Sequence, residues 1–274
     1  MDEPTQPGPA TPLPTATPAP PSGGGVPPGP GRREPRSLPA SQGAAWWSEG
    51  WQVFMAAPGP WIALILVFIL LMVGIAFVPI VGSIAESVLA PVFGGGIALG
   101  CHALAKGRPL TLGHLFEGFS GGRFMPLFIV GLIYLGAMFV LWIAVIAVVL
   151  GVAGGAGLFS ALSSDSSQMG MALLSSIGVT ALVVVPLALV AVVALTMAYW
   201  FAPPLIVLNG EEPIAAMKKS FHASWINIGA TSVYGLIWIG LAIVASIPLG
   251  LGWIVLAPVM AGSWYASWRE TFDA

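Results

Sequence analysis

Six long apolar segments dominate this chain of 274 residues, and they restrict its possible folds more than any other feature. Each is at least as long as the roughly 18 residues that mark a membrane-spanning helix. Strands of an outer-membrane barrel would alternate polar and apolar residues, and these segments do not. The sequence therefore predicts six transmembrane helices, at about residues 61–78, 84–105, 124–150, 173–201, 228–247 and 249–268.

Charged residues are too scarce to cover a soluble fold. Only 7% of the residues are charged and 57% are hydrophobic, whereas about 25% of a typical soluble domain is charged. The formal net charge of −2 argues against nucleic-acid binding, which needs a concentrated basic face. Cys101 is the single cysteine, so an internal disulfide is excluded. We expect an all-α integral membrane protein in which Cys101 is a small apolar residue of a helix.

The first 43 residues have a different composition. They are rich in proline and glycine and contain almost no large apolar side chain. Such a segment cannot bury enough surface to offset the entropy lost on ordering. We expect residues 1–43 to form a disordered cytoplasmic tail, followed by a membrane domain over residues 44–274. Pro9 and Pro12 have the spacing of a partner-binding motif, but a solvated tail is the favoured interpretation.

Three shorter stretches, each ahead of a pair of apolar segments, have the spacing of amphipathic helices. Apolar side chains recur three and four residues apart, which places them on one helical face. Such helices are typical of the membrane interface, although packing against the membrane domain would produce the same pattern. The apolar residues are Trp47, Trp51 and Phe54, then Leu112, Leu115, Phe116 and Phe119, then Ile214, Met217, Phe221 and Trp225. We expect Lys218, Lys219 and His222 to face away from the third set.

The positions of the basic residues predict the orientation in the membrane. With six spans, all nine Lys and Arg residues fall on one side, as the positive-inside rule requires of the cytoplasmic face. Both termini are therefore expected in the cytoplasm. Basic residues close to an anionic membrane surface attract lipid headgroups. The predicted headgroup-binding residues are Lys106, Arg108, Arg123, Lys218 and Lys219.

Repeated short motifs indicate an internal repeat. The pentapeptide VLAPV occurs at residues 88–92 and again at 255–259. The tripeptides at residues 54–56 and 221–223, both of the form F-x-A, are separated by the same number of residues. The predicted unit is an interfacial helix followed by a helical hairpin, and it occurs three times, at about residues 44–105, 110–201 and 211–272. Because each unit contains two spans, the three copies are parallel and are expected to form a pseudo-threefold bundle.

Prolines within the second helix of each unit predict where that helix lies. Pro91, Pro186 and Pro258 each leave backbone groups without their usual helical partner. In a membrane those groups need neighbouring protein atoms. We therefore expect all three second helices to take inner positions.

The stretches GWQVF (residues 50–54), WFAPPLIVLNGEEPIAAMKKSF (200–221) and SIPLGLGWIVLAPVMAGSWYASWRETF (246–272) carry a resemblance. Over residues 44–272 the chain resembles a family of uncharacterised proteobacterial inner-membrane proteins. More distantly, the unit is similar to the membrane domain fused to some glycerophosphodiester phosphodiesterases. The resemblance implies a multi-pass inner-membrane protein without established activity, and it transfers no functional residue.

Three features contain residues that could form a catalytic, metal or ion-binding site. Residues 118–122 fit the hydrolase pattern G-x-S-x-G, but that pattern works at a strand-to-helix turn, which is not expected here. His114 and Glu117 share a helical face, yet a zinc site needs three or four ligands. Glu86, the one acid within a predicted span, lies near its outer end, where it can reach water. We expect no catalytic residue, metal or cofactor.

The leading functional hypothesis is a non-enzymatic inner-membrane protein that organises lipid or other membrane proteins at the cytoplasmic interface. Its expected partners are the lipid bilayer, anionic lipids and other membrane proteins. The alternative is a transporter or channel, and a membrane-embedded hydrolase ranks third. The scarcity of charged residues within the spans disfavours an ion-coupled transporter, because such proteins place ionisable groups near the bilayer midplane.

Overall fold

The computed structural model describes residues 34–161 and 166–273. Regular structure in these ranges is helical, as the composition predicted, and the expectation of an all-α membrane protein is confirmed to that extent. The elements are α1 (Gln42–Ala56), α2 (Pro58–Ala76), α3 (Val81–Ala105), a 3-10 helix η1 (Leu112–Phe119), α4 (Phe124–Ala161), α5 (Ser166–Trp200), α6 (Ala202–Asn209), α7 (Pro213–Ile226), α8 (Ile228–Ser246) and α9 (Trp253–Phe272).

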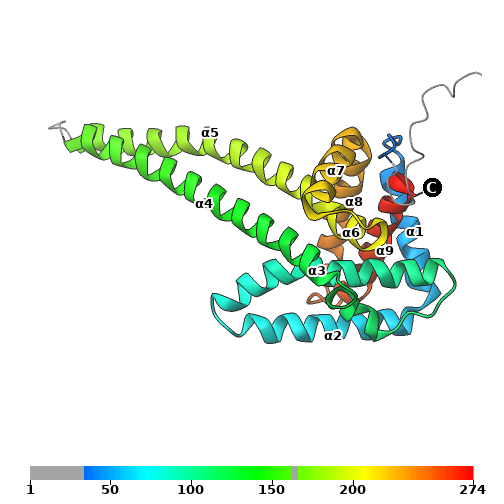
Figure 1. Ribbon diagram of the computed structural model, residues 1–274. Helices are drawn as coiled ribbons and strands as arrows, with labels where there is room; N and C mark the ends of the chain where they lie inside the picture. The colour runs from blue at the N-terminus through cyan, green and yellow to red at the C-terminus, as the bar shows by residue number, and fades with distance from the viewer. Residues whose placement is uncertain (1–33, 162–165, 274) are drawn as a thin grey trace, which may run out of the picture.

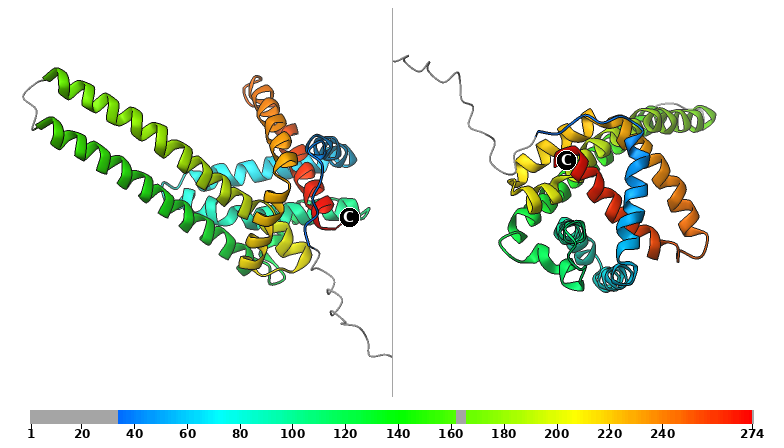
Figure 2. Two further views of the ribbon diagram at one scale, coloured as in Figure 1. Left: turned by 90° about the horizontal axis from the view of Figure 1, so that it is seen from above. Right: turned by 90° about the vertical axis from the view of Figure 1, so that its right-hand side faces the viewer.

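Three helical hairpins, α2–α3, α4–α5 and α8–α9, diverge from a common base that contains the shorter helices (Figures 1 and 2). Two of the turns share an unusual backbone. Ile80 and Leu249, each directly after a proline, have φ angles of 65° and 52°, a conformation that is uncommon for residues other than glycine. The two turns differ in length, since α3 begins directly after Ile80 whereas α9 begins four residues after Leu249.

Five helical segments in the described ranges are long and apolar enough to cross a membrane. They are Pro58–Ala76, Val81–Ala105, Phe124–Val152, Thr180–Asn209 and Ile228–Ser246. These segments correspond to the first five predicted spans. α9, the sixth, is not among them, and its buried face carries the polar residues Ser263, Ser267 and Thr271.

The predicted connection between the third and fourth spans is largely helical. α4 continues to Ala161 and α5 begins at Ser166, so only residues 162–165 of the expected loop lie outside the described residues. The third and fourth predicted spans left residues 151–172 between them, so both helices extend further than expected.

The buried core lies along α3, α6 and α9. Pro91 in α3 and Pro258 in α9 are buried, which fits an inner position for these two helices. Pro186 in α5 is exposed, because this part of α5 lies on the arm that projects from the base (Figure 1). The prediction that all three proline-containing helices are inner helices was thus wrong for α5. Pro203, at the start of α6, is buried instead.

Each short helix of the base packs on a hairpin from another part of the chain. α1 packs on α8 and α9, η1 packs on α3 and α2, and α7 packs on α5 and α4. Two glycines set the distance of closest approach: Gly50 of α1 lies against the carbonyl of Val259, and Gly118 of η1 lies against the carbonyl of Val92. η1 is a 3-10 helix rather than the expected α-helix, and it contains a second glycine, Gly113.

The ordered chain begins before residue 43, where the tail was expected to end. The amide of Arg36 donates to the carbonyl of Thr271 at 3.0 Å. The buried side chain of Asn227 accepts from the amide of Leu38 at 2.7 Å and donates to the carbonyl of Arg36 at 2.9 Å. Asn227 thus provides partners for backbone groups of Arg36 and Leu38. We call residues 36–38, which lie over α8 and α9, the strap. Residues 1–33 of the expected tail lie outside the described residues.

Candidate functional site

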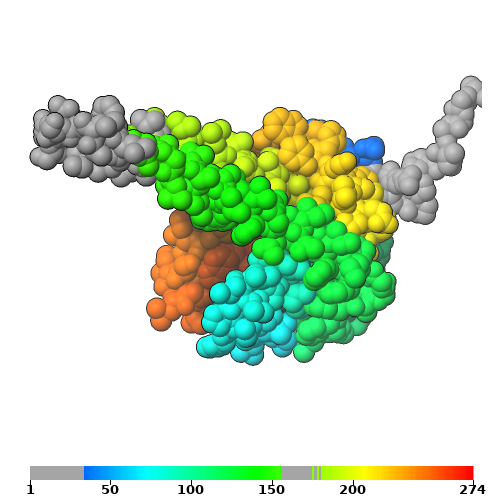
Figure 3. Space-filling model, turned by 60° about the vertical axis from the view of Figure 1, so that its left-hand side comes forward, coloured from blue at the N-terminus to red at the C-terminus, as the bar shows by residue number. Residues whose placement is uncertain are grey.

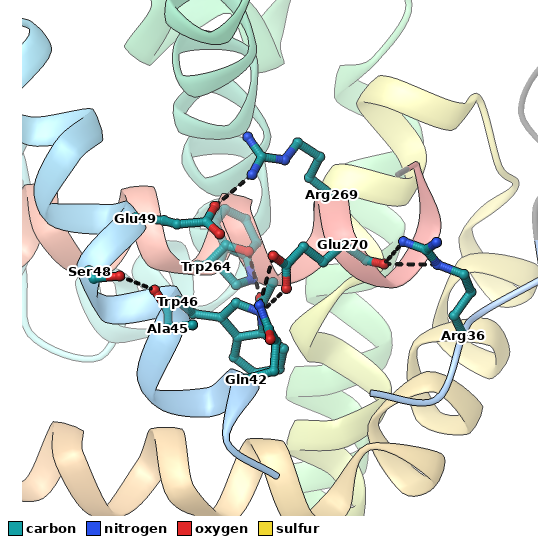
Figure 4. Close-up of polar contacts among 10 residues, drawn as sticks. Arg36, Gln42, Ala45, Trp46, Ser48, Glu49, Trp264, Arg269 and Glu270 are labelled. Carbon is teal, nitrogen blue, oxygen red and sulfur yellow. Dashed lines mark hydrogen bonds and ion pairs between the residues drawn. The ribbon is translucent and has the colours of Figure 1, made fainter. Parts of the chain in front are cut away.

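The basic side chains of the base differ in whether they are available to a ligand. Arg36 and Arg269 are engaged within the protein (Figure 4). The guanidinium of Arg36 donates twice to the backbone carbonyl of Glu270, at 2.7 and 3.2 Å. The guanidinium of Arg269 lies 2.6 Å from the carboxylate of Glu49. These two arginines hold α1, α9 and the strap together.

The carboxylate of Glu270 also forms hydrogen bonds within the protein. It accepts one hydrogen bond from the Gln42 amide and one from the Trp46 indole, both at 2.8 Å (Figure 4). Burial raises the pKa of the nearby Glu49 carboxyl above its ordinary range, and the Glu270 carboxyl raises it further, whereas the Arg269 charge acts in the opposite direction. Two acids and one cation thus share this part of the α1–α9 contact.

Lys219, one of the predicted headgroup-binding residues, is paired within the protein. Its ammonium lies 2.8 Å from the carboxylate of Glu211, and both side chains are only 14% exposed. The ammonium also lies 5.8 Å from the centre of the Phe272 ring, within the range of a cation–π contact. Lys219 therefore contributes to the packing of α7, and Glu211 neutralises the charge that an anionic ligand would need.

Lys218 is exposed and has no ion pair among the described residues. It borders a hollow formed by α4, α5 and α7, whose other lining residues are Ile133, Ala198, Ile214, Met217 and Phe221. From the spacing in the sequence, Lys218 was expected to face away from the apolar residues of α7. The structure instead places it beside Ile214 and Phe221, so that expectation was wrong.

The packing of α7 explains this arrangement. α7 buries small residues, among them Ala216, Ser220 and Ala223. The hydroxyl of Ser220 donates to the carbonyl of Met197 at 2.6 Å and accepts from the amide of Phe201 at 2.8 Å. Because small residues occupy the interior face, larger apolar side chains face outward. Ile214 and Trp225 are each 60% exposed and Phe221 is 38% exposed.

The remaining predicted headgroup-binding residues flank η1. Lys106 and Arg108 are exposed after the end of α3, and Arg123 is half-buried before α4. None of the three has an ion pair with another described residue. Apolar side chains of η1 are exposed between them, at Leu112, Phe116 and Phe119. A second group of cations and exposed apolar residues therefore lies at the base.

The residues of the G-x-S-x-G motif and the His114–Glu117 pair form contacts that stabilise η1. Ser120 follows η1 rather than a strand, and its hydroxyl donates to the carbonyl of Glu117 at 3.1 Å. The ring of His114 contacts Thr111 and caps η1. Within residues 34–161 and 166–273, no three His, Cys, Asp or Glu side chains lie close enough together to hold a metal ion. Asp165, an acid that could in principle serve a G-x-S-x-G serine, lies outside the described residues.

The fold defines a multi-pass helical membrane protein, and one comparison with known proteins agrees. The chain is 26% identical over 251 residues to a probable inner membrane protein of Burkholderia thailandensis, which covers 85% of this chain and 92% of that relative. No family model matches the chain, and no solved structure matches it. Similarity to a probable inner membrane protein, together with several apolar helices of membrane length, supports an inner-membrane location. The more distant resemblance to a phosphodiesterase membrane domain stays a prediction.

Proposed function

We propose that this protein is a non-enzymatic inner-membrane protein that organises anionic lipid at its cytoplasmic face. The observation that carries this proposal is the outward face of α7. There the unpaired Lys218 stands beside the exposed side chains of Ile214, Phe221 and Trp225. A cation next to apolar side chains suits the boundary between lipid headgroups and acyl chains.

The proposal includes a six-span topology with both termini in the cytoplasm. α9 has 20 residues, enough to cross a hydrocarbon core about 30 Å thick. Its low hydropathy comes chiefly from the partly exposed Arg269 and Glu270 near its end, and its other polar residues lie inside the protein. The hydroxyls of Ser263, Ser267 and Thr271 donate to carbonyls of α9 itself, so these residues need no contact with water.

The proposal also includes three related units. η1 and α7 each pack on the hairpin that precedes them, and α1 completes the order by packing on the last hairpin, α8–α9. This cyclic order of contacts supports a pseudo-threefold arrangement. The third counterpart of the Ala-Pro motif is then Ala202-Pro203 rather than the region of Pro186, because Pro203 is buried as Pro91 and Pro258 are.

Lys218 and Lys219 provide a matched pair for testing the lipid proposal. The protein would be reconstituted in vesicles with a small fraction of phosphatidylglycerol and extracted with its surrounding lipid in a polymer-bounded disc. We expect the wild type to enrich phosphatidylglycerol relative to the vesicle. Lys218→Gln should weaken this association by about fivefold, because one basic residue near an anionic surface contributes on the order of 1 kcal/mol.

Lys219→Gln serves as the control, because Glu211 already neutralises Lys219. This change should lower thermal stability but leave the enrichment nearly intact. Equal losses in the two variants, or no enrichment in the wild type, would contradict the proposal. A proton-dependent flux in vesicles that Glu86→Gln abolishes, while both lysines prove dispensable, would favour the transporter alternative instead.

A further inference from the structure

An apolar cavity of about 390 Å³ lies where the three hairpins meet. Its walls come from five helices: Phe68 of α2, Gly94 of α3, Trp200 of α5, Pro203 of α6 and Met260 of α9, together with neighbouring residues. Figure 3 shows a hollow on the surface between α2, in cyan, and α8, in orange, beneath α4. The cavity therefore lies at the inner end of the space that the diverging hairpins leave open.

Two of the tryptophans in the wall, Trp253 and Trp264, direct their polar N–H groups to partners in the protein. Gly94 has no side chain, and its position is within ordinary contact distance of Trp264 and Pro203. The indole nitrogen of Trp264 donates to the carbonyl of Trp200 at 2.8 Å, and that of Trp253 donates to the hydroxyl of Ser246 at 3.2 Å. Both tryptophans thus present ring carbons to the cavity while their N–H groups are satisfied.

Size and chemistry together select the occupant. A cavity without polar partners does not hold water well, and its volume lies within the range of about 300–1,000 Å³ typical of ligand sites. The cavity is small beside an α-helix, which is about 10–12 Å across with its side chains. A single unbranched hydrocarbon chain is the narrower occupant and suits the apolar wall.

We propose that this cavity binds one acyl chain of a bilayer phospholipid, which enters through the hollow between α2 and α8. The site is separate from the basic residues of the base, and it does not depend on the charge of the headgroup. A chain held there fills the space at the point where the hairpins separate and contacts all three of them.

Filling the cavity tests the proposal. Ala257 lines it, whereas Val255, two residues earlier in α9, is exposed and does not. The full chain would be reconstituted with phosphatidylcholine carrying brominated acyl chains, because bromine quenches tryptophan fluorescence on contact. The same protein would then be stripped with detergent and the retained phospholipid counted by native mass spectrometry. We expect the stripped wild type to remain partly quenched and to retain one phospholipid, and the stripped Ala257→Phe variant to lose most of both signals.

Two further variants keep the result interpretable. Val255→Phe adds similar bulk outside the cavity and should behave as the wild type does. Met260→Ala enlarges the cavity and should retain the lipid even if Ala257→Phe folds poorly. Retention that is unchanged in Ala257→Phe, or absent in the wild type, would overturn the proposal. Because phosphatidylcholine carries no net charge, this outcome is independent of the Lys218 test.

Discussion

Single glycines control how closely α1 and η1 approach the hairpins. A Cβ atom at Gly50 would meet the carbonyl of Val259 and the backbone of Ser263. Neither group can move without shifting α9, so even one added methyl group is costly at this position.

We expect Gly50→Ala to lower the free energy of unfolding by about 1–3 kcal/mol, the usual cost of overpacking. Thermal unfolding in detergent would measure the change. Gly59→Ala is the matched control, since Gly59 is also helical but has nothing within 4 Å of its Cβ position. Helix propensity favours alanine at both positions, so an equal loss at Gly59 would show that the contact with α9 is not the cause of the effect at Gly50.

The shared acids at the α1–α9 contact predict a pH dependence. Burial and the Glu270 carboxyl raise the pKa of Glu49 in the folded protein, so the folded state binds this proton more tightly than the unfolded state does. Stability contributed by Glu49 is therefore lost as pH rises from its ordinary value of 4.5 through the raised folded value. In Glu49→Gln this decrease should be smaller, as a pH series of thermal unfolding curves would show. An identical pH profile in wild type and variant would contradict the assignment.

At the scale of helices, periodicity in the sequence was sufficient for the apolar hairpins but not for the contacts between them. Residue spacing predicted α1 and α7, and long apolar runs predicted α2, α3, α4, α5 and α8. The same spacing could not show which face of α7 is buried, because Ala216, Ser220 and Ala223 contribute little to an apolar pattern although they make the contact.

The candidate site illustrates the same limit. The sequence identified the basic residues, but Lys218 and Lys219 are neighbours with nearly identical local surroundings in the chain. Only the fold shows that Glu211 pairs with Lys219 and not with Lys218. The acyl-chain cavity left no signal at all in the sequence, since its residues are apolar and come from five separate helices.

The strap predicts two different results for two truncations. Deleting residues 1–33 should leave thermal stability in detergent nearly unchanged, because a segment of that composition buries little surface. Deleting residues 1–40 removes the hydrogen bonds of Arg36 and Leu38 and leaves the buried amide of Asn227 without two partners. The longer deletion should cost about 1–3 kcal/mol. Equal stability of the two truncated proteins would show that the strap does not contribute.

For the whole molecule, the proposed topology predicts the side on which each loop lies. A reporter that is active only in the periplasm should be active when inserted near Asp165 and silent when inserted near Glu211. The reason is that an even number of spans returns the chain to its starting side and places every Lys and Arg in the cytoplasm. The reverse pattern would reject the orientation, and activity at both sites would reject the six-span count.

The contact between α1 and α9 also bears on how the protein is made. A chain is synthesised from its N-terminus, so α1 emerges first and α9 emerges last. Trp46 and Phe54 of α1 are buried in the finished structure, but their partners in α8 and α9 do not yet exist while the first two hairpins enter the membrane. α1 is therefore the helix made longest before its neighbours, and a ribosome that stops before Trp253 releases a protein with two complete hairpins, no α9 and an uncovered α1. Quality-control proteases that recognise exposed aromatic side chains could then identify an unfinished protein by the exposed Trp46 and Phe54 of α1.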